Sequence, residues 1–231
     1  MYKAVIFDLG NTLAASASLT EALESVVESN KSAFVGEKIE SEIGALYKPD
    51  QKLQPDWKVI WENCFNEAGL FFSEDVGRQH LEAFCSMSKT FPQVVELLSE
   101  LKQMGIKLGL LSNVTGPYDI FQRDLDNRGL SNYFNSIIWS SAIGYRKPCR
   151  KAFEIILADL GVEAKDALMI GDSEIADIGG AINIGMDSAL ISEIGNLESR
   201  ANYQVAIHNL FDDVIAITKP GSGREKHTPQ L

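Results

Sequence analysis

Residues 4–12 read Ala4-Val5-Ile6-Phe7-Asp8-Leu9-Gly10-Asn11-Thr12. Four apolar residues in a row, followed at once by an acidic residue and then a glycine, indicate a short strand that ends in a tight loop. A continuous apolar strand of this kind is typical of a parallel sheet that helices cover on both faces. The stretch therefore predicts an α/β fold in which Asp8 lies at the carboxyl end of a buried strand.

Between residues 14 and 89 the pattern is helical. The sequence Ser18-Leu19-Thr20-Glu21 fits a capping box at the start of one helix. Apolar residues at helical spacing follow in segments 39–46 and 57–64, and Ser73 is a suitable N-cap for a fourth helix. No strand pattern interrupts this stretch, so we expect a small all-helical domain inserted after the first strand.

From residue 90 onward, strand and helix patterns alternate. The strands are expected at 107–111, 136–139, 167–170, 188–191 and 203–207, with helices between them. Such alternation indicates βαβ units and a parallel sheet. We expect a doubly wound α/β core formed by residues 1–13 and 90–219, the helical domain at 14–89, and a flexible tail at 220–231, which is rich in Gly, Pro and charged residues.

Polar side chains follow several of the predicted strands. In open α/β sheets, ligands bind beyond the carboxyl ends of the strands, near the point where the strand order reverses. Asp8, Ser112 and Asp172 stand at or just after such ends, and Lys147 lies in the loop after strand 136–139. We therefore expect two carboxylates, a hydroxyl and an amine to meet at one edge of the sheet.

Composition and charge narrow the classes of function. The 231 residues include 21 Lys and Arg against 32 Asp and Glu, a formal net charge of −11. This balance argues against binding to nucleic acid or to an anionic membrane surface, because both are bound through clustered Lys and Arg. No signal-peptide or membrane-spanning pattern occurs, and the three cysteines show no CxxC spacing. We expect a cytoplasmic protein with reduced thiols.

Four segments resemble, in order and in placement, the four motifs of the haloacid dehalogenase-like (HAD) hydrolase superfamily. They are Phe7–Leu13, Leu110–Asn113, Gly144–Pro148 and Gly171–Ala181. The resemblance implies a HAD-like Rossmannoid core, with residues 14–89 in the position of the family's type-1 helical cap. It implies a hydrolase, most simply an Mg²⁺-dependent phosphatase that acts on a small phosphorylated metabolite.

The candidate metal ligands follow from the chemistry of Mg²⁺ and from this resemblance. An aspartate can attack phosphorus and form an aspartyl-phosphate, and Asp8 is placed for that step. Mg²⁺ prefers oxygen ligands and usually takes one or two carboxylates from a protein, here those of Asp8 and Asp172. The resemblance implies that the backbone carbonyl of Gly10 is a third ligand, and Asp177 would hold a metal-bound water.

The candidate phosphate-binding residues are Ser112, Asn113 and Lys147. The Ser112 hydroxyl and the backbone N–H of Asn113 would donate hydrogen bonds to the phosphoryl oxygens. Lys147 would neutralise charge between Asp8 and the phosphate, and we count it with Asp8 as a catalytic residue. With a surface this acidic, attraction of an anionic substrate would come from Mg²⁺ and Lys147 locally.

Gly10 departs from the family pattern. Phosphatases of the family typically carry a second Asp at this position, which protonates the leaving group and later deprotonates the attacking water. Its loss would slow the hydrolysis of alkyl phosphates by about 10²–10⁴, the usual contribution of general acid–base catalysis. Three alternatives follow: a weak or inactive HAD-like protein that binds a phosphorylated ligand or a protein partner, a carbon–halogen hydrolase, and a phosphonate hydrolase.

Overall fold

The computed structural model of the chain describes residues 2–192 and 198–219. Its strands are β1 (Ala4–Phe7), β2 (Ala14–Ala15), β3 (Lys89–Thr90), β4 (Lys107–Ser112), β5 (Ser136–Trp139), β6 (Ala167–Gly171), β7 (Asp187–Ser192) and β8 (Tyr203–Ala206). Its α-helices are α1 (Leu19–Val26), α2 (Ser32–Gly44), α3 (Trp57–Glu67), α4 (Glu74–Met87), α5 (Val94–Gln103), α6 (Tyr118–Asn127), α7 (Ser140–Ile143), α8 (Arg150–Leu160), α9 (Gly179–Ile182) and α10 (Leu210–Thr218). The tail predicted at 220–231 lies outside the described residues. Within them, no helix combines the length and the apolar character needed to cross a bilayer.

Within the described residues, six strands form one parallel sheet in the order β5-β4-β1-β6-β7-β8. The chain adds β4 and β5 on one side of β1 and then returns to add β6, β7 and β8 on the other. Phe7 at the end of β1 is level with Leu110 in β4 and Ile170 in β6. This confirms the predicted doubly wound fold and places the reversal of strand order beside Asp8.

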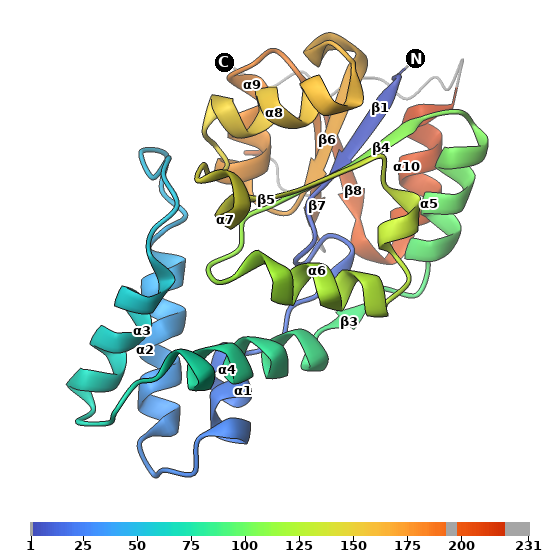
Figure 1. Ribbon diagram of the computed structural model, residues 1–231. Coiled ribbons are helices and arrows are strands. Elements are labelled where there is room, and N and C mark those ends of the chain that lie inside the picture. The colour runs from blue at the N-terminus through green and yellow to red at the C-terminus, as the bar shows by residue number, and fades with distance from the viewer. Residues whose placement is uncertain (1, 193–197, 220–231) are drawn as a thin grey trace.

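Helices cover both faces of the sheet (Figure 1). Alternate residues of β1 point to opposite layers. Val5 and Phe7 join the apolar cluster that includes residues of α5 and α10, whereas Ala4 and Ile6 join the cluster that includes residues of α8 and α9. All four side chains are fully buried. Burial on both sides explains why the strand reads as a continuous apolar run.

Helices α1–α4, here called the helical insertion, lie beyond the carboxyl ends of the strands (Figure 1). Two of the predicted N-caps are confirmed, because Ser18 Oγ accepts from the N–H of Glu21 and Ser73 Oγ accepts from the N–H of Val76. Two short strands that the sequence did not predict lie at the two ends of residues 14–90. Strands β2 and β3 form an antiparallel pair where the chain enters and leaves the insertion. Two residues are too few to show the alternation of a strand. The division into domains at 14 and 89 stays a prediction.

A buried polar pair lies inside the helical insertion. Trp61 and His80 are both fully buried. Trp61 Nε1–H donates to His80 Nδ1 (3.0 Å), and His80 Nε2 lies 2.7 Å from the carbonyl oxygen of Leu19. Burial lowers the pKa of His80 to about 4 against the hydrogen bond to Leu19. The imidazole is therefore neutral near pH 7 and donates through Nε2, as a packed core histidine.

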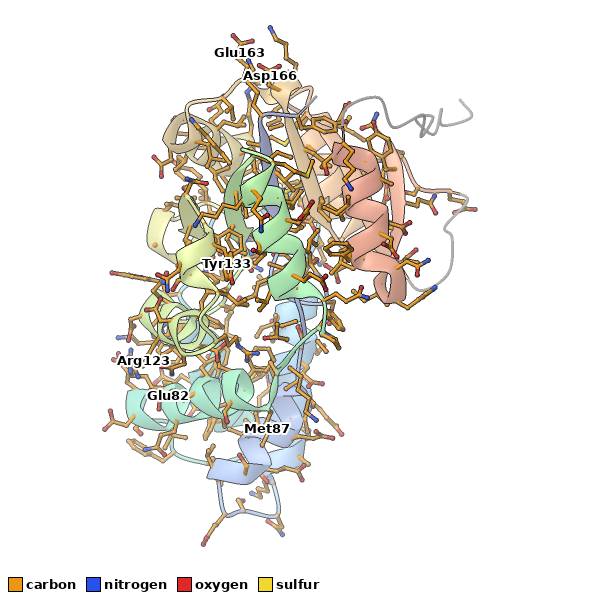
Figure 2. All side chains as sticks on the ribbon, turned by 90° about the vertical axis from the view of Figure 1, so that its right-hand side faces the viewer. Glu82, Met87, Arg123, Tyr133, Glu163 and Asp166 are labelled. Carbon is orange, nitrogen blue, oxygen red and sulfur yellow. The ribbon has the colours of Figure 1, made fainter. Side chains whose placement is uncertain are left out.

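Two sets of contacts join the helical insertion to the core. In Figure 2, Glu82 of α4 lies beside Arg123 of α6, with 3.0 Å between Oε1 and Nη1. On the other side, residues 52–54, here called the strap, run antiparallel to residues 144–146. The N–H of Arg146 donates to the carbonyl of Lys52, and the N–H of Gln54 donates to the carbonyl of Gly144, each at 3.0 Å. The strap therefore bonds to the residue that precedes Lys147.

Candidate active site

The predicted site residues come together at the carboxyl edge of the sheet. Asp8 follows β1, Ser112 ends β4, and Asp172 follows β6. These three residues line one cleft of about 610 Å³, and so do Gly10 and Asn113. The cleft extends from the sheet edge to α1, α2 and α4 of the helical insertion. The expectation that distant polar residues would meet at one edge is confirmed, while their individual roles stay predictions.

Lys147 lies beneath Asp8. Its Nζ is 2.8 Å from Oδ1 of Asp8 and 2.6 Å from Oδ1 of Asp177. The lysine residue is 2% exposed. Burial by itself lowers the pKa of this ammonium, but the charges of Asp177 and Asp8 outweigh burial and raise the pKa above its ordinary value. The lysine is therefore charged and fixes one oxygen of Asp8.

Asp177 is fully buried and its two oxygens have different partners. Oδ1 accepts from Lys147, and Oδ2 accepts from the backbone N–H of Ser173 (3.0 Å). Burial raises the pKa of Asp177 to about 7, against the opposing charge of Lys147. The carboxylate packs so closely on Gly171 that a Cβ there would lie 2.2 Å from Oδ2. Only glycine fits at the end of β6.

Asp172 completes a cluster of three carboxylates. Ligand oxygens of Asp8, Asp172 and Asp177 all lie within 4.8 Å of one another. Burial, together with the charge of Asp8, raises the pKa of Asp172 to about 6. Grouped carboxylates with raised pKa values favour a bound cation, and an all-oxygen set suits a hard ion such as Mg²⁺. The residues present therefore fit a divalent cation.

The structure also shows two supporting side chains that the sequence analysis left without a role. Asn11 donates from Nδ2 to Oδ2 of Asp172 (3.3 Å) and accepts at Oδ1 from the N–H of Ser16 (3.2 Å). Its φ of 53° is in the left-handed region, which Asn tolerates better than most residues. The Asn113 side chain forms two hydrogen bonds to the backbone of Lys147, at 2.9 and 2.8 Å. An Asn directly after a glycine or a strand-end serine is the signal that could have pointed to both positions.

Ser16 occupies the space beside Gly10. A Cβ built on Gly10 would lie 2.9 Å from the Ser16 hydroxyl oxygen. Ser16 lines the same cleft as Asp8. A hydroxyl is a much weaker acid than a carboxylic acid, so Ser16 can donate a hydrogen bond into the cleft but is a poor proton donor.

Comparison with known proteins agrees with this geometry. The family model of haloacid dehalogenase-like hydrolases matches residues 2–185. The chain therefore belongs to the haloacid dehalogenase-like hydrolases. It is 28% identical over 201 residues to a glyceraldehyde 3-phosphate phosphatase of Methanopyrus kandleri, covering 80% of this chain and 82% of that protein. It is 30% identical over 115 residues to a ribulose-1,5-bisphosphate 5-phosphatase of Halopiger xanaduensis, where the match covers 50% of this chain and only 47% of that protein.

Solved structures confirm the fold. The crystal structure of the HAD-hydrolase YfnB from Bacillus subtilis, bound to magnesium, superposes with a TM-score of 0.74. That match covers 94% of this chain and 98% of the other, at 19% sequence identity. At this identity the likeness concerns the fold alone.

Proposed function

We propose that the protein is an Mg²⁺-dependent phosphomonoester hydrolase that acts on a small phosphorylated metabolite through an aspartyl-phosphate at Asp8. One observation carries the proposal. Asp8 faces the cleft with one oxygen held by the buried ammonium of Lys147 at 2.8 Å, and Asp172 lies beside it. The phosphatase names of the two relatives support the same class of substrate.

Asp8, Asp172 and the backbone carbonyl of Gly10 would hold the magnesium ion, and Asp177 would act through a bound water. Both oxygens of Asp177 already accept hydrogen bonds from protein groups, which supports an indirect role. Bound Mg²⁺ would neutralise the phosphoryl oxygens so that a carboxylate can approach them.

The chemical step uses the remaining oxygen of Asp8. Its Oδ2 attacks phosphorus, the bond from phosphorus to the ester oxygen breaks, and the leaving oxygen departs with the electron pair. The Ser112 hydroxyl and the N–H of Asn113 bind the phosphoryl oxygens, while Lys147 balances the growing charge. Water then hydrolyses the aspartyl-phosphate to inorganic phosphate and regenerates Asp8. The helical insertion excludes bulk water during both steps.

Gly10 restricts which esters react well. No carboxylic acid stands at this position to protonate a leaving alkoxide, so esters of acidic alcohols or of acyl groups are expected to react fastest.

We also place the protein in a reducing cytoplasm, because Cys64, Cys85 and Cys149 all have free thiols.

The second candidate is a protein that binds a phosphorylated ligand and turns it over weakly or not at all, and Gly10 is the observation that favours it. A carbon–halogen hydrolase needs no metal, and the cluster of three carboxylates argues against it. A phosphonate hydrolase would need a Schiff-base lysine in the helical insertion. Among the described residues, no lysine of the helical insertion lines the cleft. Lys31, for example, donates a hydrogen bond to the carbonyl of Ala68 instead.

Turnover of p-nitrophenyl phosphate and acetyl phosphate, with and without Mg²⁺, tests the proposal. We expect Mg²⁺-dependent release of phosphate that Asp8→Asn abolishes. Asp212→Asn, an exposed aspartate of α10, is the matched control and should keep the wild-type rate. Binding of phosphate esters without turnover of either substrate would favour the second candidate.

A further inference from the structure

A large part of the cleft lining, here called the wall, is apolar. The apolar side chains that line it are Leu19, Ile43, Leu81 and Phe84 from the helical insertion and Val114 and Phe121 from the core. These residues come from α1, α2, α4 and α6 and from the loop after β4. The group attached to a phosphate bound at Asp8 would extend toward this wall.

Both rims of the cleft expose further apolar surface. Tyr47, just after α2, is 39% exposed, and Ile175, in the loop after Asp172, is 36% exposed. Both line the cleft. Partly exposed apolar side chains that gather at a concave site indicate an apolar ligand, because covering them removes apolar surface from water.

The charged groups that line the cleft beyond the three carboxylates have partners within the protein. Arg128 donates from Nε to Asp124 (2.7 Å), and its Nη1 and Nη2 donate to Thr90 and to the carbonyls of Cys85 and Ser88. Four of its five N–H groups are therefore occupied. Across the cleft, Glu174 accepts from Arg200 and Ser199.

Two other cations lie near but do not face the ligand. Lys147 is held between Asp8 and Asp177. Arg146 is fully buried behind Tyr47, with its guanidinium carbon 5.6 Å from the ring centroid and its Nη1 bonded to Thr115. Its Nε and Nη2 have no hydrogen-bond partner, yet the side chain does not line the cleft. Arg128 is thus the only cation among the described residues that line the cleft, and its charge is already paired with Asp124.

We propose that the substrate is the phosphate monoester of a phenol or another acidic hydroxyl compound with an uncharged, apolar organic group, and not a phosphate that carries a second acid. The inference rests on the proposed function for the place of the phosphate and adds the chemistry of the rest of the substrate. A carboxylate pressed against this wall would lose its hydration and gain no counter-charge, which is unfavourable.

Two esters that differ in one terminal group test the proposal. The first is 4-propylphenyl phosphate, and the second is 4-(2-carboxyethyl)phenyl phosphate, in which a carboxylate replaces the terminal methyl group and the phenol leaving group has similar acidity. Calorimetric titration of Asp8→Asn protein with each ester in the presence of Mg²⁺ measures binding without turnover. We expect the propyl ester to bind at least tenfold more tightly, and wild-type protein to show the same preference in kcat/KM.

A cation placed in the wall should change the preference. Ile43→Lys puts an ammonium in the cleft, whereas Val59→Lys adds the same charge to α3 at a position that is 51% exposed and outside the cleft lining. Ile43→Lys should bring the two affinities to within threefold of each other or reverse their order. Val59→Lys should leave the preference as in the parent protein.

The outcomes separate the two proposals. Equal or tighter binding of the carboxylate ester to the parent protein overturns the inference, as the Nε and Nη2 groups of Arg146 would then be reached from the cleft. Failure of both esters to bind overturns it as well. A retained preference for the propyl ester, with no turnover of p-nitrophenyl phosphate, overturns the hydrolase function and supports the ligand class.

Discussion

Replacing Gly10 with aspartate should restore a general acid to the site. Gly10 is not among the glycines with positive φ, so its backbone accepts a side chain. The new Cβ would lie 2.9 Å from Ser16 Oγ, and the short serine side chain must rotate to make room. General acid–base catalysis contributes about 10²–10⁴ in rate, roughly 3–5 kcal/mol of barrier. A strained rotamer costs about 0.5–1.5 kcal/mol, which leaves a net gain of roughly 10- to 10³-fold.

The assay compares two leaving groups. An alkyl phosphate needs a proton on its leaving oxygen, whereas p-nitrophenolate departs without one. Gly10→Asp should therefore raise kcat on phenethyl phosphate by at least tenfold and change kcat on p-nitrophenyl phosphate by less than threefold. Gly10→Asp combined with Ser16→Ala should gain more, because the close contact is removed, and Ser16→Ala alone is the control. An unchanged or lower rate on the alkyl ester would refute the reasoning and show that another group already donates the proton.

Three further predictions concern residues of the helical insertion and of the sheet edge at the site. The free energy of unfolding should fall by roughly 3 kcal/mol between pH 7 and pH 4 through His80, since its pKa is about 4 in the folded protein against an ordinary value of 6.5, and each pKa unit is worth about 1.4 kcal/mol. Urea unfolding at both pH values should show this loss in wild type relative to His80→Gln, and parallel pH profiles would contradict it. Gly171→Ala should destabilise the fold by about 1–3 kcal/mol and lower the turnover of phosphate esters, because the new methyl group displaces Asp177. Urea unfolding and turnover assays check both effects, and wild-type values for both would show that the contact relaxes freely. Gln54→Ala should lower kcat and cost about 1–3 kcal/mol, because it removes the hydrogen bond from the Gln54 amide to the carbonyl of Val114 and the acceptor of the Ser140 hydroxyl; a change in KM alone would argue that the strap affects only binding.

Much of the fold could be predicted because its signals are local. The strand before Asp8 is buried on both faces, so it reads as an apolar run, and Ser112 and Asp172 end equally buried strands. Parallel strands put their carboxyl ends at one edge, which brings these residues together without any knowledge of the loops. Residues whose places are set by strand ends were therefore predictable.

Other parts of the site depend on contacts between distant loops. The ion pair of Lys147 with Asp177 joins residues 30 positions apart, and no hydrophobic periodicity in the sequence predicts such a pair. One helix was expected between the strands at 167–170 and 188–191, but a π-helical turn at Glu174–Ile178 precedes the short α9. In that turn the N–H groups of Asp177 and Ile178 both donate to the carbonyl of Ser173, and the Asp177 carboxylate accepts from the Ser173 N–H. The strap contains mostly polar residues without periodicity, so only the folded chain reveals its partner.

The strap has a practical consequence for exchanging helical insertions between related enzymes. Lys52 and Gln54 bond to the backbone on either side of Tyr145, two residues before the lysine that holds Asp8. A chimera that imports a foreign insertion would remove these bonds along with the original substrate pocket. A lower rate of the chimera could then have two causes at once, the changed recognition of the substrate and a displacement of the Lys147 ammonium. Grafts that retain residues 52–54 of the host would keep the two effects apart.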